Sequence, residues 1–229
     1  MHSNIIIKHP QYENDSTLFT IDLNNVTIEK LDDLVKEDLY YATKRRAFLF
    51  KNTDKDQFEP FANRPAFRNF KNTIAFTGSV YTKTCEIRNN DILYEDILQQ
   101  VSELIKLRSR RAIIRFTNPF DELYISEVDP SLTEDISCIS TIHYVLLDDN
   151  TLDVKFNFRA SDCKNELYYD IITLYEYFVM PIYRCKDLNG YLIKNINPCE
   201  FYLSTTQNTK YLMHTIKKLA LDFDLGDKK

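Results

Sequence analysis

The sequence predicts an α+β fold in a single domain spanning residues 1–229. Segments that alternate polar and apolar residues, as strands do, are mixed with segments of helical spacing, and no regular βαβ repeat appears. The composition, 44% hydrophobic and 28% charged, is that of a soluble globular protein. A chain of 229 residues can bury a sizeable core without disulfides or metal ions.

The N-terminal part predicts two strands, a helix and a less regular segment. Residues 4–7 and 18–22 are rich in apolar and β-branched residues, which favours strands. Residues 27–44 predict a helix because apolar residues recur on one face. The residues on this face are Ile28, Leu31, Leu34, Val35 and Leu39. Residues 51–72 are polar and predict a loop, and residues 74–81 predict a further strand.

The C-terminal part predicts three helices and four strands. Apolar residues at helical spacing indicate the helices, at residues 91–107, 165–183 and 207–223. Strands are predicted at residues 112–116, 140–147, 152–159 and 191–203. The two middle strands form a hairpin across residues 148–151, because the second of them alternates polar and apolar residues without interruption.

Composition and charge also narrow the functional class. The net charge of -5 disfavours a surface for a nucleic-acid polymer, and no segment predicts a membrane span or a secretory signal. Five irregularly spaced cysteines without Cys-x-x-Cys favour neither disulfides nor a zinc site, so we expect a cytoplasmic protein without a metal. Three glycines are too few for a glycine-rich phosphate loop. A bound phosphate must therefore be held by side chains, and arginine suits this role best.

Cys138 is the candidate nucleophile. A single cysteine is usually a small buried hydrophobic residue, and this is our interpretation of the other four, Cys85, Cys163, Cys185 and Cys199. Cys138 differs because it stands where an acidic loop enters the predicted hairpin, whose second strand ends in Arg159. A thiolate needs a positive neighbour at neutral pH, and strand pairing would bring Arg159 back beside Cys138. From the residues alone, a buried structural cysteine remains the alternative.

Three arginines are candidates for binding a phosphate. Arg110 and Arg111 follow a predicted helix, where a basic pair is usually a solvated turn. Arg159 ends a strand and has Asp162 nearby as a possible surface partner. Together the three could hold a phosphate, but sequence spacing does not show that they meet.

In their order and spacing these motifs resemble the thymidylate synthase superfamily over roughly residues 88–215. The matching positions are the Ser-Arg-Arg of Ser109, Arg110 and Arg111, the catalytic cysteine at Cys138, Arg159-x-Ser161-Asp162 for the family's Arg-Ser-x-Asp motif, and the sugar-binding tyrosine at Tyr202. The resemblance implies a thymidylate-synthase-like mixed sheet packed with helices, with one sheet face at a homodimer interface. Residues 1–87 would be a divergent N-terminal part of that domain.

The resemblance also implies a role for each matching residue. Arg159 and Ser161 would bind the phosphate of a pyrimidine nucleoside monophosphate, together with Arg110 and Arg111 donated by the partner subunit. The base and sugar would be bound by Asp162, Asp170, Glu200 and Tyr202.

Asp170 points to a cytosine-specific branch of the superfamily. Thymidylate synthase has an asparagine eleven places after the motif arginine, where its amide accepts from uracil N3–H and donates to O4. Cytosine presents the reverse pattern, and an aspartate can accept from N4 and share a proton with N3. Cytidylate hydroxymethylases carry aspartate at this position, as this chain does. A solvated helix residue is the alternative interpretation of Asp170.

The mechanism that the resemblance implies is covalent catalysis. The Cys138 thiolate would add to C6 of the pyrimidine, and C5 would then attack the methylene carbon of 5,10-methylenetetrahydrofolate. Addition of water to the resulting exocyclic methylene gives 5-hydroxymethyl-cytidylate. Asp170 would protonate N3, and the arginines would hold the phosphate so that C6 meets the sulfur.

Departures from the family pattern keep other functions open. Glu200 replaces a histidine, and because a carboxylate accepts from two vicinal hydroxyls, it favours CMP over dCMP. The family's Tyr-Gly-x-Gln-Trp segment is missing, and its N-terminal catalytic glutamate has only a weak match in Glu37, for which a solvated helix residue is the alternative. Both departures favour a non-catalytic nucleotide-binding protein of the same fold. An unrelated α+β module with a chance match is a third possibility. A dUMP methylase is disfavoured by Asp170.

Overall fold

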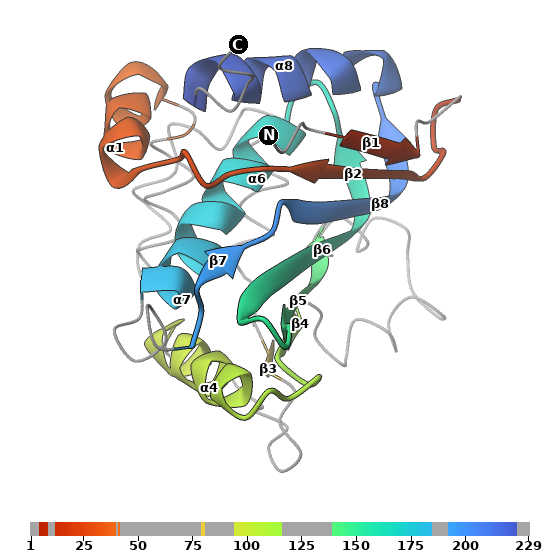
Figure 1. The fold of residues 1–229 in the computed structure, drawn as a ribbon. Coiled ribbons are helices and arrows are strands. Elements are labelled where there is room, and N and C mark those ends of the chain that lie inside the picture. Colours follow the sequence, from red (N-terminus) through yellow and green to blue (C-terminus); the bar gives the residue numbers. More distant parts are fainter. Residues whose placement is uncertain are drawn as a thin grey trace, which may run out of the picture.

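The structure, a computed structural model, describes residues 5–8, 12–39, 41, 79–80, 94–115, 139–184 and 192–223. Within these residues a mixed sheet packs against helices, which confirms the predicted α+β class (Figure 1). The strands are β1 (Ile5–Lys8), β2 (Thr17–Ile21), β3 (Ser79–Val80), β4 (Ile113–Arg115), β5 (Ile139–Leu146), β6 (Thr151–Asp162), β7 (Asn195–Ile196) and β8 (Cys199–Gln207). The helical elements are α1 (Ile28–Glu37), α4 (Tyr94–Lys106), α6 (Leu167–Leu174), the π-helical turn η3 (Tyr175–Val179), α7 (Met180–Arg184), the 3-10 turn η4 (Thr209–Tyr211) and α8 (Leu212–Phe223).

The sheet has the strand order β1-β2-β8-β6-β5-β4-β3, and β7 pairs with β6 outside this path. Strands β6 and β8 are parallel, with Phe156 opposite Phe201, whereas the other neighbours along the path are antiparallel. The connection from β6 to β8 carries α6, η3 and α7. A tight turn joins only antiparallel strands, so a parallel pair needs such a crossover.

Apolar residues on one face of the central strands form the core of the molecule. Phe156 stacks on Phe201 with ring centroids 4.7 Å apart, and Phe19 stacks on Phe201 at 5.3 Å. All three side chains are fully buried. Burial of one such side chain stabilises a fold by about 1.5–3 kcal/mol. The three rings therefore link β2, β8 and β6 beneath the helices.

Neighbouring strands carry an extra residue at the same level of the sheet. Buried residues in these strands normally alternate with more exposed ones. Two residues instead of one separate the buried Phe158 and Ser161 in β6, and likewise the buried Leu203 and Thr206 in β8. Phe158 pairs with Leu203 and Ser161 with Thr206, so the two strands stay in register through the step. Strand β5 has its own register shift directly after Ile139. Extra residues of this kind redirect side chains and often border functional sites.

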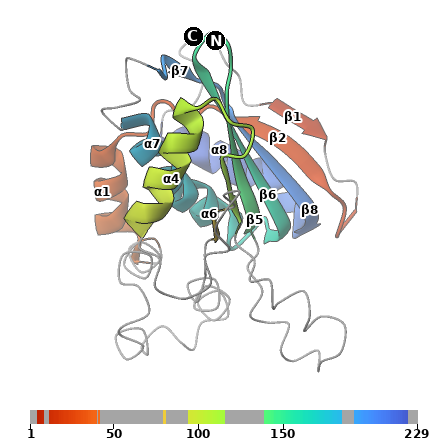
Figure 2. The same cartoon turned by 90° about the horizontal axis from the view of Figure 1, so that it is seen from below.

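The described helices lie on one side of the sheet, and none of them covers the other side (Figure 2). We call this second side the open face. It carries the polar positions of the alternating central strands, which are Thr141, His143, Asp153, Lys155, Asn157, Glu200 and Tyr202.

The first helix ends earlier than predicted. It stops at Glu37 instead of residue 44, because Asp38 is extended (φ -118°, ψ 100°) and its Oδ1 accepts a hydrogen bond from the Tyr41 N–H at 3.1 Å. Aspartate is a strong N-cap, so it ends one helical segment and begins another. Leu39 is consequently 57% exposed and does not lie on the core face where the spacing had placed it.

The predicted hairpin is confirmed, with longer strands than expected. Strand β6 continues past residue 159 to Asp162, and β8 continues past residue 203 to Gln207, because each contains the extra residue described above. Helix α8 accordingly begins at Leu212 instead of residue 207. The loop predicted at residues 51–72 and most of the strand predicted at 74–81 lie outside the described residues.

The helix predicted at residues 165–183 is present as α6, η3 and α7 in succession. The π-helical turn precedes Pro181, which has no N–H to donate and whose ring crowds the carbonyl four residues earlier. The buried Tyr144 of β5 donates its hydroxyl to the Phe178 carbonyl inside this turn, at 2.9 Å. This bond gives the irregular turn a hydrogen-bond partner and fixes the helix to the sheet.

Candidate functional site

Several predicted site residues gather at one end of the sheet, where β6 and β8 stop. We call this the site end. Arg159, Ser161 and Asp162 are three of the last four residues of β6, and Asp170 lies in the first turn of α6, after a short connecting turn. The sequence motif Arg-x-Ser-Asp is thus placed at a strand end.

Cys138 lies outside the described residues. Ile139, the next residue in the chain, begins β5 and pairs with Phe158. Phe158 immediately precedes Arg159 in β6. The described part of the hairpin therefore has the register on which the expected proximity of Cys138 and Arg159 depends.

Asp162 organises the turn that joins β6 to α6. Its Oδ1 accepts hydrogen bonds from the N–H groups of Lys164 at 2.8 Å and Asn165 at 3.2 Å. The same oxygen accepts from the Asn208 amide at 2.9 Å, and Oδ2 accepts from the Asn165 amide at 2.8 Å. With four donors, the carboxylate holds the start of α6, and with it Asp170, in place.

Asp170 is half-buried, and its N–H donates to the Glu166 carbonyl at 3.0 Å. It takes part in further interactions within the chain. Its position on a well-packed helix, next to buried Ile171 and Ile172, is rigid enough to present a carboxylate in one orientation.

A cluster of tyrosines and carboxylates surrounds the start of α6, and the sequence did not predict it. Tyr169 donates to Asp38 at 2.8 Å, and Tyr168 donates to Asp222 of α8 at 2.6 Å. Lys218 Nζ lies 3.9 Å from the centre of the Tyr168 ring. Burial, and next the bond to Asp222, raise the pKa of Tyr168, so its hydroxyl stays a donor at neutral pH. The partners are 131 and 54 residues apart in the chain, so no local pattern could reveal them.

The predicted sugar-binding residues lie on the open face, in the same region as Arg159. Tyr202 is 38% exposed and stands opposite Asn157 in the parallel β6–β8 pair. Glu200 stands opposite Lys155, with 3.6 Å between Oε1 and Nζ. Arg159, two positions after Asn157, is exposed and about 7 Å further along β6. The parallel register thus places Arg159 two positions along β6 from the residue opposite Tyr202, although the two strands come from segments more than 40 residues apart.

Ser161 lies on the core face of β6. It is 3% exposed, and its Oγ has no hydrogen-bond partner in the part of the chain that the structure describes. A buried hydroxyl left without a partner costs about 1–3 kcal/mol. Arg159 and Ser161 therefore leave the strand in different directions, on either side of the extra residue.

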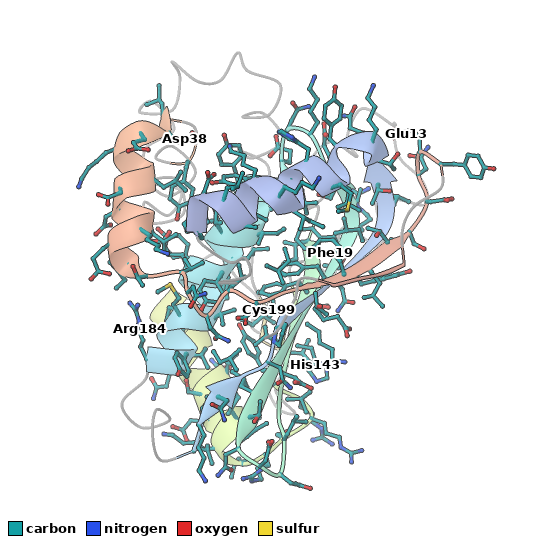
Figure 3. All side chains as sticks on the ribbon, turned by 45° about the horizontal axis from the view of Figure 1, so that its top comes forward. Glu13, Phe19, Asp38, His143, Arg184 and Cys199 are labelled. Carbon is teal, nitrogen blue, oxygen red and sulfur yellow. The ribbon has the colours of Figure 1, made fainter. Side chains whose placement is uncertain are left out.

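Arg110 and Arg111 lie toward the other end of the sheet. Arg111 stands two residues before Ile113, which pairs with His143 of β5. From the level of Arg111 to Ile139 the strand spans about 20 Å. Figure 3 shows His143 well away from Glu13, which bonds Thr209 just beyond the end of β8. Within one chain these two arginines are too distant to share a phosphate with Arg159.

Two of the other cysteines are buried, as predicted. Cys163 and Cys199 are free thiols in the core. Burial, with Asp162 as the next cause, raises the pKa of Cys163 to about 12, and burial also raises the pKa of Cys199. Neither forms a thiolate at neutral pH. Cys85 and Cys185 lie outside the described residues.

Across the described residues, no group of histidine, cysteine, aspartate and glutamate side chains could hold a metal ion. The described helices include none with the length and apolar character needed to cross a membrane.

No protein-family model matches the chain, and no curated protein matches it either. Its function is therefore inferred from the residues and their geometry.

Proposed function

We propose that the chain is a cytoplasmic, homodimeric cytidylate 5-hydroxymethylase with a thymidylate-synthase-like architecture. It transfers a one-carbon unit from 5,10-methylenetetrahydrofolate to C5 of a cytidine monophosphate, CMP in preference to dCMP, and yields 5-hydroxymethyl-cytidylate. The observation that carries the proposal is the parallel β6–β8 register, in which Tyr202 stands opposite Asn157, two positions before Arg159. The pairing of Ile139 with Phe158 supports it, because Cys138 directly precedes Ile139.

A second subunit accounts for the distance between Arg159 and the Arg110–Arg111 pair. Two copies can pack through their open faces about a two-fold axis that lies across the strands. Such an axis brings opposite ends of the two sheets together, so the arginines of one copy approach the site end of the other. Arg110 and Arg111 are exposed, and their guanidinium groups have no partner among the described residues, which leaves them free for a phosphate.

The proposed nucleotide lies at the site end with its phosphate on Arg159. Ser161, which the resemblance matches to a phosphate ligand, lies on the core face of β6 and is 3% exposed, so the proposal rests on Arg159 for the phosphate contact from this chain. Tyr202 and Glu200 bind the sugar from the open face. Lys155 Nζ lies 3.6 Å from Glu200 Oε1, and the Glu200 carboxylate has oxygens that can accept from both ribose hydroxyls.

The base is read by Asp170, supported by Asp162. Asp162 fixes the turn before α6 through four hydrogen bonds, so the carboxylate of Asp170 is presented on a rigid helix. Asp170 shares a proton with N3 of cytosine, and its second oxygen accepts from the exocyclic amine. Uracil has a donor at N3 and an acceptor at O4, so it does not match this arrangement.

The proposed chemistry starts from the Cys138 thiolate, which Arg159 stabilises by its charge. The sulfur forms a bond to C6 of the base, and the proton that Asp170 holds at N3 accepts the electron density displaced by this addition. Carbon 5 then carries nucleophilic character. The folate, when bound, supplies the one-carbon unit. None of the described residues is assigned to it.

Release of tritium from C5 tests the proposal. We expect CMP labelled with tritium at C5 to release label when the protein and methylenetetrahydrofolate are both present, and dCMP to release it more slowly. If the wild type binds CMP but releases no tritium, the enzymatic proposal is wrong and the non-catalytic nucleotide-binding protein replaces it.

Two cysteine variants complete this experiment. Cys138→Ser should abolish release and retain CMP binding, because a serine hydroxyl is a far weaker nucleophile than a thiolate. Cys163→Ala is the matched control: its thiol is buried and protonated, so release should continue. Release by Cys138→Ser at the wild-type rate would refute the nucleophile assignment.

A further inference from the structure

We propose that Arg108 is a positioning residue that holds the phosphate-binding pair Arg110 and Arg111 in place. Its side chain fastens residues 109–111, which we call the arginine turn, to the turn of the β5–β6 hairpin. This rests on the proposed function, which assigns a phosphate to Arg110 and Arg111. The sequence shows three similar basic residues within four positions. In the described part of the chain, the side chain of Arg108 is hydrogen-bonded, whereas those of Arg110 and Arg111 have no partner.

The end of α4 does not by itself require an arginine at position 108. The backbone of Arg108 has the left-handed helical conformation (φ 49°). Its N–H donates to the Ile105 carbonyl at 2.9 Å, and the Ser109 N–H donates to the Leu104 carbonyl at 2.9 Å. This is the Schellman ending, in which glycine is the favoured residue at the left-handed position. A side chain there is disfavoured by contact of Cβ with the backbone. Arg108 therefore occupies a glycine position, which suggests a role for its side chain.

The Arg108 guanidinium spans the gap to the hairpin turn with two hydrogen bonds. Nη1 donates to the Leu147 carbonyl at 2.8 Å, and Nη2 donates to Oδ1 of Asn150. The backbone of Asn150 also has the left-handed conformation (φ 66°), and its N–H donates to the same Leu147 carbonyl at 3.0 Å. A forked donor on two fixed acceptors sets both position and orientation. The guanidinium thus joins two turns that are far apart in the sequence.

The arginine turn is also held by its own backbone and by β5. Ser109 Oγ accepts from the Arg111 N–H at 3.2 Å, and the Ile113 N–H donates to the Arg111 carbonyl at 2.8 Å. His143 Nε2 lies 3.1 Å from the Arg110 carbonyl, which can only accept, so this nitrogen is the donor. The main chain of the turn is therefore fixed, while the Arg110 and Arg111 side chains point into solvent without a described partner. A pair arranged in this way binds a phosphate without first losing backbone freedom.

The variant Arg108→Gly distinguishes a positioning role of the Arg108 side chain from a role in the stability of the fold, because glycine suits the left-handed position better than arginine does. We expect its melting temperature to equal or exceed that of the wild type. Its affinity for CMP, measured by calorimetry, should fall about tenfold, as for the loss of one charge-assisted hydrogen bond to the phosphate. Its affinity for cytidine, which has no phosphate, should not change. Equal changes for CMP and cytidine, or none for CMP, would overturn the proposal.

Asn150→Gly provides a second test, because glycine also keeps the left-handed conformation at position 150. We expect a smaller loss of CMP affinity, since the bond from Arg108 to Leu147 remains. The double variant should bind CMP no more weakly than Arg108→Gly alone, because the two residues act through one contact. Additive losses would contradict the assignment.

Hydrogen exchange tests the positioning without relying on the nucleotide. The amides of Arg111 and Ile113 should exchange faster in Arg108→Gly than in the wild type. Unchanged exchange overturns the positioning role, whatever the ligand data show. If the wild type binds CMP and cytidine equally, the phosphate assignment of the proposed function fails, and faster exchange would still support Arg108 as the residue that fixes the turn.

Discussion

The two ends of the sheet carry similar charged residues in opposite states. At the site end, Asp162 accepts four hydrogen bonds, and Arg159 and Asp170 take part in interactions within their own chain. At the other end, Arg110 and Arg111 have no partner among the described residues, although the turn that carries them is fixed. The charged groups at the site end therefore stabilise the local structure. The two arginines at the other end, which have no partner among the described residues, are able to bind a ligand.

This difference shows why spacing alone cannot assign a phosphate site. A charged side chain that is already paired must exchange its partner before it binds a ligand, whereas an unpaired side chain on a fixed turn is immediately available. About 20 Å of strand separates the two ends, so one chain cannot use both for one ligand. Either the two ends meet across a dimer, or they have unrelated roles.

Subunit complementation is expected to give the largest effect. Cys138→Ser and the double variant Arg110→Ala/Arg111→Ala should each be inactive as homodimers. If the two are mixed by refolding together, half of the dimers are mixed, and in these one of two sites is complete. Activity should return to about a quarter of the wild-type level. Failure to recover any tritium release would mean that the two ends do not share a site across the dimer.

A change of base preference is the next largest effect. Asp170→Asn should favour UMP over CMP, because the amide matches the donor at N3 and the acceptor at O4 of uracil. The ratio of kcat/KM for the two nucleotides should change about a hundredfold. Asp148→Asn, an exposed hairpin-turn residue, is the matched control and should leave the ratio as it is. An unchanged ratio in Asp170→Asn would remove the cytosine assignment.

The structural role of Asp162 can be measured as stability. Asp162→Ala removes four hydrogen bonds, three of them exposed to water, and we expect the free energy of unfolding in urea to fall by about 2 kcal/mol. Asp148→Ala should have almost no effect, because Asp148 is exposed. Equal stability of the two variants would show that the site end does not depend on this carboxylate for its shape.

Alkaline pH should have the smallest effect, through Cys163. Its pKa is raised from 9.0 to about 12, so the folded state keeps a proton that the unfolded state loses above pH 9. The contribution of this thiol to stability is therefore complete below pH 9 and declines as the pH rises toward 12, by at most about 1.4 kcal/mol per pH unit. Unfolding midpoints of wild type and Cys163→Ala should converge between pH 8 and pH 10.5. If the difference between the two midpoints stays the same across this pH range, the burial of this thiol is contradicted.

Local patterns predicted the elements of the fold well where one period continues without interruption. Residues Leu152 to Phe158 alternate strictly, and the hairpin that they predicted is present. The end of α1 was mispredicted because Asp38 caps a new segment while the apolar spacing continues to Leu39. The extra residues in β6 and β8 were missed because Arg159 and Ser204 each look like an ordinary polar position of an alternating strand. They are recognised only when the two strands are seen in register.

The candidate site shows the same limit. Its residues could be named from motif and spacing, and the end of β6 does contain three of them. Cys138 lies outside the described residues, so its place remains a prediction. The bonds of Tyr169 to Asp38 and of Arg108 to the hairpin turn could not be predicted, because each joins segments that share no local pattern.

The sequence by itself determined the α+β class, the hairpin, the helical segments and the identity of the charged residues, because these depend on periodicity and on side-chain chemistry within short windows. Only the tertiary structure decided which of those charges are already paired and on which face of the sheet each lies. It also showed that Arg108 is hydrogen-bonded while Arg110 and Arg111 have no partner among the residues it describes. The physical reason is that a charged group acts according to its partners and its distance from them. Those partners come from strands and turns that pairing brings together from distant parts of the chain.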